Sequence, residues 1–176
     1  VEPGKLAADC GQCAALCCVA STFSVSADFA IDKPSGTPCP NLQGFRCGVH
    51  GELRALGFPG CVVFDCFGAG QQVTQGTFGG RDWRSEPAIG PQMFSVFNVM
   101  RALHSMLWHL EQAREVEAAA SMRGELEDAL IDLREMCSLS ADELDDFDLS
   151  VPGRASHGLL QRASAMAREG HTSTVK

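Results

Sequence analysis

Tyrosine is absent from the 176-residue sequence, and positive charge is scarce. The lack of tyrosine removes one common acid–base and radical residue from the candidate chemistry. Lysine and arginine together number 14 against 22 aspartates and glutamates, which gives a net charge of −8. A chain this acidic repels phosphate backbones, so we expect no nucleic-acid partner.

Long hydrophobic runs are also missing. The longest uncharged stretch, residues 10–27, is interrupted by glycine, glutamine and hydroxyl side chains and holds four cysteines, so it is a poor membrane span. The sequence begins without a basic segment followed by an apolar one, which is the pattern of a signal peptide. We therefore expect a cytoplasmic protein with no membrane partner.

What the sequence has in excess is cysteine. Hydrophobic residues make up 45% and charged residues 20%, an ordinary composition for one compact globular unit. Of nine cysteines, Cys137 stands alone in the second half. The other eight fall within residues 10–66 and are Cys10, Cys13, Cys17, Cys18, Cys39, Cys47, Cys61 and Cys66.

A dense cysteine set without a secretory signal favours metal binding over a disulfide framework or simple reduced thiols. Zinc takes four thiolate or imidazole ligands, and iron–sulfur clusters also take four thiolates. Eight cysteines therefore suffice for two centres, with Cys10/Cys13 and Cys61/Cys66 as natural pairs. The adjacent Cys17 and Cys18 point in different directions. They can face two metal centres, or one can bind while the other packs or reacts.

Composition divides the chain into a Cys-rich region, residues 1–88, and a helical region, residues 89–176, which we expect to form one compact unit. Short helices are predicted at 10–18 and 48–56 and a β-prone run at 60–66. Helical periodicity predicts helices at 92–112, 121–137 and 155–169, with a capping box that starts a short acidic helix at Ser140. The predicted fold is mainly α, with little β: an irregular Cys-rich half packed on a three- to four-helix bundle.

The order of the cysteines resembles a known family. The segments that carry the likeness are Cys10-x2-Cys13-x3-Cys17-Cys18, Cys39-Pro40-Asn41-Leu42, Cys47-Gly48-Val49-His50, Gly60-Cys61 and Phe64-Asp65-Cys66. They resemble the YkgJ-like zinc- or iron-chelating family, with the pattern CxxCxxCC. With residues 78–84 and the helix after them, the chain is similar to a module that precedes pentapeptide repeats in some actinobacterial proteins.

The resemblance covers about residues 8–110 and implies metal binding. Flagellin lysine methylases share the opening motif, and an iron–sulfur cluster is implicated in that group, so the likeness favours iron–sulfur over zinc. Two features depart from the pattern. Three residues rather than two precede the vicinal cysteines, and no pentapeptide repeats follow the helices.

Other polar residues are weaker candidates. His50 lies three residues after Cys47, a spacing that suits a ligand or a hydrogen-bond donor to one. His104 and His109 are five residues apart and do not share a helix face well, so a joint metal site is not expected. Asp65 and Asp82 fit turn or capping roles better than acid–base work. Arg81, Trp83 and Arg84 form a basic-aromatic patch, either a partner contact or packing, and Cys137 fits a buried core thiol.

The favoured hypothesis is a metal-binding protein that holds an iron–sulfur cluster through the eight N-terminal cysteines and has a redox, sensing or accessory role. One alternative is a zinc-stabilised structural or interaction module. Another is a cluster-dependent enzyme that modifies a protein partner, and a third is a disulfide-stapled interaction module. A protein or redox partner is expected, and the apolar helical stripe within residues 93–110 raises the hypothesis of a homodimer.

Overall fold

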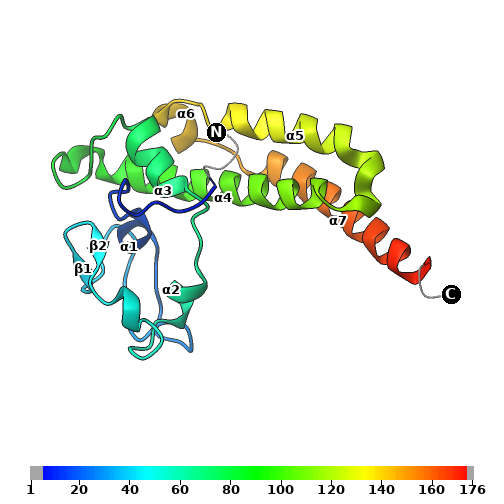
Figure 1. The fold of residues 1–176 in the computed structure, drawn as a ribbon. Coiled ribbons are helices and arrows are strands. Elements are labelled where there is room, and N and C mark those ends of the chain that lie inside the picture. The colour runs from blue at the N-terminus through cyan, green and yellow to red at the C-terminus, as the bar shows by residue number, and fades with distance from the viewer. Residues whose placement is uncertain (1–5, 174–176) are drawn as a thin grey trace.

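The structure, a computed structural model, describes residues 6–173, with side chains described to residue 169. Its elements follow the predicted fold class: helices dominate and one two-stranded sheet is present (Figure 1). In chain order they are α1 (Leu16–Ala20), β1 (Leu42–Gln43), β2 (Arg46–Cys47), α2 (Pro59–Val63), α3 (Ala69–Gln71), α4 (Gly90–Arg114), α5 (Arg123–Met136), α6 (Ala141–Asp145) and α7 (Ser150–Ser173). The prediction of a mainly α fold is confirmed.

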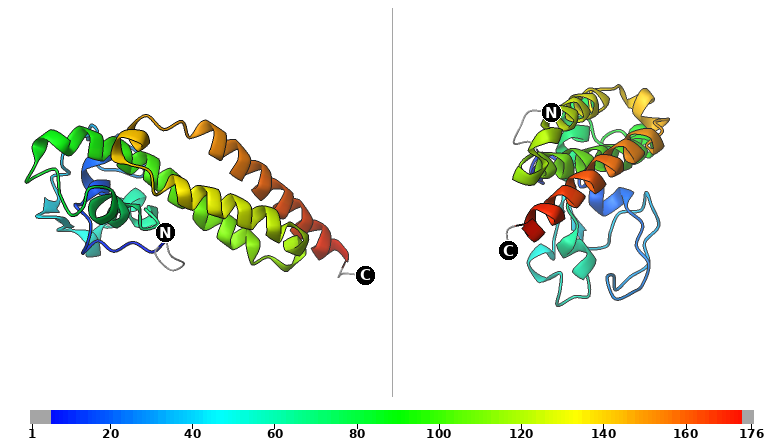
Figure 2. Two further views of the ribbon diagram at one scale, coloured as in Figure 1. Left: turned by 90° about the horizontal axis from the view of Figure 1, so that it is seen from above. Right: turned by 90° about the vertical axis from the view of Figure 1, so that its right-hand side faces the viewer.

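Helix α4 is the element against which most of the other helices pack. It begins with Pro91 in its first turn, where a proline is favoured because no helical hydrogen bond is lost there. Its apolar residues recur at helical spacing, and those from Met93 to Leu110 that face inward are fully buried. Helices α5, α6 and α7 pack along it, while α1 and α3 pack near its N-terminal end (Figures 1 and 2).

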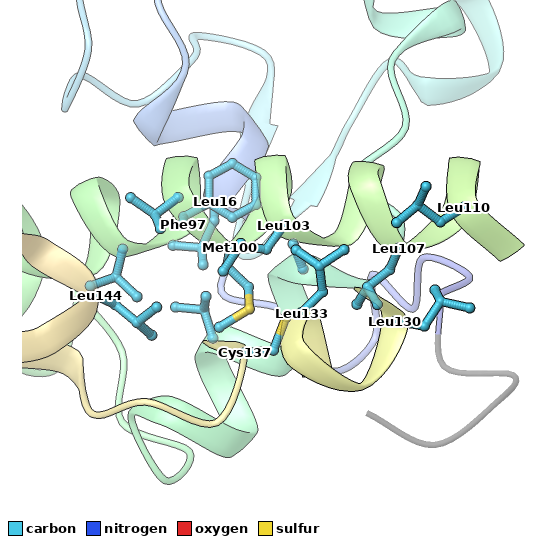
Figure 3. Packing of buried hydrophobic residues seen from close by; sticks show 14 of the residues in the cluster. Leu16, Phe97, Met100, Leu103, Leu107, Leu110, Leu130, Leu133, Cys137 and Leu144 are labelled. Atoms are coloured by element: carbon cyan, nitrogen blue, oxygen red, sulfur yellow. The ribbon is translucent and has the colours of Figure 1, made fainter. Parts of the chain in front are cut away.

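One hydrophobic core joins the Cys-rich region to the helical region. Leu16 and Val19 of α1 lie in the same buried cluster as Phe97 and Met100 of α4. The close view shows Leu16 on one side of α4 and side chains of α5 and α6 on the other (Figure 3). Cys137, at the C-terminal end of α5, is 1% exposed and packs in this core. The short helix α1 is thus fixed in place by the helical half.

The local structure of the Cys-rich region differs from the prediction. The helix expected over 10–18 begins only at Leu16, because Ala15 adopts a left-handed conformation with φ 56°. The β-prone run at 60–66 instead starts as helix α2, with Pro59 in the first helical turn. β-Propensity is a weak preference that surroundings override. The helix expected over 48–56 is reduced to a 3₁₀ turn, His50–Glu52, followed by further turns.

The helical region follows the prediction more closely. Helix α5 lies within the expected 121–137, and a 3₁₀ segment, Glu117–Met122, precedes it. The capping box at Ser140 is present, with Glu143 N–H donating to the Ser140 hydroxyl and the Glu143 carboxylate accepting from Ser140 N–H. Helix α7 is longer than expected at both ends. No helix in the described part of the chain is long and apolar enough to cross a membrane.

The shared core makes a stability prediction at Phe97, which is 1% exposed. We expect Phe97→Ala to lower the free energy of unfolding by about 3–5 kcal/mol, because it removes a buried ring and leaves a cavity. Val151→Ala, on an exposed part of α7, is the control and should stay within about 0.5 kcal/mol of wild type. Urea unfolding measures both. A loss at Phe97 no larger than that of the control would contradict a core shared by the two halves.

Candidate metal centre

The structure gathers the eight predicted ligands around α1. Cys17 and Cys18 lie on α1, Cys47 ends β2, Cys61 lies on α2, and the remaining four lie in the connecting segments. All nine cysteines carry free thiols. Cys137 is separated from the other eight by its place in the core at the end of α5.

Four thiols line one small cavity. Cys10, Cys13, Cys17 and Cys66 surround a space of about 20 Å³ whose other walls include Gly70 and Phe97. A space of this size holds about one water-sized particle. The four cysteines at this cavity supply the donor type that zinc or iron favours, and a bound ion would have to draw their sulfurs inward into binding positions. We call these four residues the first thiol group.

Gly70 of α3 makes room for this group. A Cβ atom at position 70 would lie 2.5 Å from Cys13 Sγ, a distance that real Cβ contacts do not reach. Only glycine therefore lets the α3 backbone approach the Cys13 sulfur so closely. The nearby Gly68 has a different reason, a left-handed φ of 79° just before α3.

A strained turn carries the chain from Cys13 to α1. Ala14 N–H donates to the Thr74 hydroxyl at 3.1 Å, and the Trp83 indole N–H donates to the Ala14 carbonyl at 2.7 Å. These two bonds hold both polar groups of Ala14 just before the left-handed Ala15. The turn reverses the chain so that Cys13 and Cys17 line the same cavity.

The other four cysteines form a second thiol group: Cys18, Cys39, Cys47 and Cys61. Cys39 N–H donates to the Cys18 carbonyl at 2.9 Å. Leu42 N–H in turn donates to the Cys39 carbonyl, and the β1–β2 pairing sets Leu42 opposite Cys47. Cys61 is close enough to Cys17, Cys39 and Cys47 for each of them to raise the pKa of its thiol.

The vicinal cysteines connect the two groups. Their Sγ atoms lie 3.9 Å apart, well beyond the roughly 2.05 Å of a disulfide bond. Cys17 lines the cavity of the first group, while Cys18 is joined through its carbonyl to Cys39 of the second. The predicted pair Cys61/Cys66 is divided between the groups, whereas Cys10 and Cys13 stay together.

Four of these thiols, those of Cys10, Cys13, Cys17 and Cys61, have a raised pKa and so favour the protonated form. Burial raises the pKa of Cys13 and of Cys61 to about 11, and a contact with the Cys18 thiol together with burial raises that of Cys17 further. Between residues 6 and 169, no three His, Cys, Asp or Glu side chains already stand where they would hold an ion. A bound metal would therefore draw the sulfurs together and displace their protons.

His104 is a buried residue that the sequence did not single out for this region. It is 1% exposed on α4, and its Nδ1 lies 2.7 Å from the Phe67 carbonyl, so Nδ1 carries the proton that it donates. Its Nε2 is buried without a hydrogen-bond partner in the described part of the chain. Phe67 has a left-handed φ of 48° and directly follows Cys66. His104 thus fixes the segment that carries a thiol of the first group.

The other polar residues considered from the sequence are either exposed or contact neighbouring parts of the chain. His50 is exposed on its 3₁₀ turn. Asp65 accepts a hydrogen bond from Phe67 N–H, and Asp82 accepts from the N–H groups of residues 84 and 85, so both fix turns. In the basic-aromatic patch, Trp83 packs edge-on against Phe45 and Phe94, and Arg84 lies over its ring.

Comparison with known proteins found a relative among the curated proteins. The chain is 46% identical over 140 residues to the uncharacterized protein YybG of Bacillus subtilis (strain 168), a match that covers 79% of this chain and 50% of the relative. The chain thus spans about half the length of the curated relative it matches. No family model matches the chain, and no solved structure matches it.

The buried histidine makes stability depend on pH. Burial lowers the pKa of His104 below its ordinary value of 6.5, so the unfolded chain takes up the proton first as the pH falls. The stability that neutral His104 provides is thus present above pH 6.5 and is lost below it. We expect His104→Asn, which keeps an N–H donor for Phe67, to reduce the slope of unfolding free energy between about pH 6.5 and 5 by up to about 1.4 kcal/mol per pH unit.

The control for this measurement is His157→Asn on α7, where the histidine is exposed. Urea unfolding at a series of pH values should give the wild-type slope for this control. An unchanged slope in His104→Asn would mean that His104 does not take up a proton on unfolding.

Proposed function

We propose that this protein binds metal through two centres, each with four thiolate ligands from one of the two thiol groups. The observation that carries the proposal is the cavity of about 20 Å³ lined by Cys10, Cys13, Cys17 and Cys66. Four soft donors around one partly open space match the donor set of structural thiolate sites. The fit of Gly70 against the Cys13 sulfur further supports a site shaped around sulfur.

The second centre uses Cys18, Cys39, Cys47 and Cys61. Its support is the chain of backbone contacts from Cys18 through Cys39 to the β1–β2 hairpin that ends at Cys47. Because a helix turns by about 100° per residue, Cys17 and Cys18 serve two separate ions more readily than one. Their sulfurs lie 3.9 Å apart, close to the roughly 3.8 Å between two thiolates on one tetrahedral zinc ion, so a single ion bound by both cysteines is the alternative arrangement.

A single ion, zinc or iron, is one occupant that four thiolates suit. Zinc suits four closed thiolate ligands and does no redox chemistry, so a zinc-loaded protein would use the metal to hold the Cys-rich region in shape. The binding free energy would then be folding free energy, because a preformed site does not exist in the unfolded chain. The iron–sulfur cluster expected from the family resemblance remains the alternative, and measured metal content separates the two.

The ligand assignment is tested by serine substitutions, one in each group. Elemental analysis of anaerobically purified protein should give about two metal ions per chain for the wild type and about one each for Cys13→Ser and Cys61→Ser, since a hydroxyl is a poor ligand for a soft ion. Cys137→Ser is the matched control: it removes a cysteine from the core and should leave both ions bound.

Each result for metal content bears on one part of the assignment. Wild-type metal content in Cys13→Ser would overturn the first centre, and in Cys61→Ser the second. Loss of all metal in both variants would mean one joint centre of eight thiolates. Iron with acid-labile sulfide and a visible absorption band would replace single ions by an iron–sulfur cluster and make a redox or sensing role the next hypothesis.

The close approach at Gly70 gives an independent test of the first centre. We expect Gly70→Ala to lower metal content from about two ions to about one, because the new methyl group displaces the Cys13 sulfur. The control is Gly124→Ala on α5, where a Cβ atom meets nothing within 4 Å. It should keep both ions and gain up to about 1 kcal/mol of stability, since alanine is the better helix former. Full metal content in Gly70→Ala would show that the α3 contact does not shape the centre.

A further inference from the structure

Lys33 is a buried cation beside the second thiol group. It is one of only three lysines in the sequence, and its residue is 2% exposed. Its Nζ donates hydrogen bonds to the carbonyls of Val19, Pro34 and Thr37 at 3.1, 3.1 and 2.9 Å. A neutral amine has only two N–H donors, so three carbonyl acceptors require the ammonium form. The side chain is therefore a fixed positive charge inside the Cys-rich region.

A buried ammonium is costly unless a negative charge lies near it. No carboxylate among residues 6–169 forms an ion pair with Lys33, and the neighbouring Asp32 is exposed and accepts a hydrogen bond from Val25 N–H. Burial lowers the pKa of Lys33, and the groups that act against this are Cys39, Cys18 and Cys17. These cysteines are therefore the acidic groups that act on the ammonium, and they supply negative charge once they lose their protons, as metal binding requires.

Backbone hydrogen bonds place Lys33 near Cys18 and Cys39. Val19, whose carbonyl accepts from Nζ, directly follows Cys18, and this carbonyl also accepts from Gly36 N–H. The segment from Lys33 leads to Cys39, whose N–H donates to the Cys18 carbonyl. On the other side, the Phe23 ring lies 5.0 Å below Nζ and stacks on Phe29. Lys33 is therefore buried between the aromatic pair and the segment whose backbone bonds join Cys18 and Cys39.

We propose that Lys33 is the counter-charge of the second metal centre, a positioning residue that stabilises the thiolates of Cys18 and Cys39 without binding the metal. This inference deepens the proposed function and rests on it. A divalent ion with four thiolates carries a net charge of about −2. A fixed ammonium in a medium of low dielectric offsets part of that charge and favours the deprotonated ligands. All three N–H groups of Lys33 point to carbonyls, so its role is electrostatic.

The test compares zinc affinity in full-length variants by competition with a chromophoric chelator. We expect Lys33→Met and Lys33→Gln to retain room for two zinc ions but to bind one of them about 10- to 100-fold more weakly, the range seen when an outer partner of a metal ligand is removed. Lys33→Arg keeps the charge and should restore most of the affinity. Arg54→Met is the control, since it removes an exposed cation of the same region and should leave both affinities unchanged.

The variants distinguish an electrostatic role of Lys33 from a role in which it only donates hydrogen bonds to backbone carbonyls. If Lys33 only caps carbonyls, Gln should restore the affinity as well as Arg does, and that result would overturn the proposal. Two zinc affinities equal to wild type in Lys33→Met would overturn it as well. Should the Met variant fail to fold, as circular dichroism would reveal, the comparison of Gln with Arg still decides the question.

A further measurement tests the effect of Lys33 on the thiols independently of metal binding. In metal-free wild type, Lys33→Gln and Arg54→Met, alkylation followed by mass spectrometry gives the reactivity of each thiol against pH. A shift of the Cys18 and Cys39 profiles upward by about one pH unit or more in Lys33→Gln alone supports the counter-charge. Unchanged profiles contradict it. If wild type binds no metal at all, the proposed function fails, while these profiles still decide whether Lys33 acts on the thiols.

Discussion

The constraint on which the Cys-rich half depends is the orientation of the five-residue helix α1. Leu16 and Val19, three residues apart, are both fully buried against α4 and fix the rotation of the helix. Cys17 and Cys18 between them are then forced onto the remaining surface, about 100° apart. Cys17 lines the cavity with Cys13, and the Cys18 carbonyl accepts a hydrogen bond from Cys39 N–H. The helical core thus sets the directions in which the two vicinal cysteines leave α1.

The helical half could be predicted because its signals are local. The apolar stripe of α4 and the capping box at Ser140 depend only on residues a few positions apart. The Cys-rich half has no such periodicity, and three predictions for it are wrong: the start of the first helix, the β-prone run at 60–66 and the helix over 48–56. Ala15 is left-handed because Thr74 and Trp83 fix the residue before it. No pattern within residues 10–18 signals those bonds.

The candidate site, like the fold, could be predicted from the sequence only in part. The eight cysteines and their capacity for two centres follow from number and spacing alone, yet the grouping does not. Cys61 and Cys66 are close in sequence but lie in different groups, since α2 ends at Val63 and the chain continues in extended form. The lysine and the histidine beside the thiols escape prediction because burial alone makes them unusual. No sequence motif indicates that Lys33 and His104 are buried beside the thiols.

The two thiol groups differ in their electrostatic surroundings, and this difference bears on the order in which they would bind metal. In the first group, partial burial together with Cys17, Cys66 and Asp9 raises the pKa of the Cys10 thiol, and the nearby Arg46 opposes this only in part. The second group has a buried ammonium whose charge solvent cannot screen. Under the proposed function, a cation beside the second group would favour deprotonated ligands there, whereas the first group has only the exposed Arg46 near it. The second group would then load first, and because α1 is already held by the helical core, Cys17 would not need that ion to order its helix.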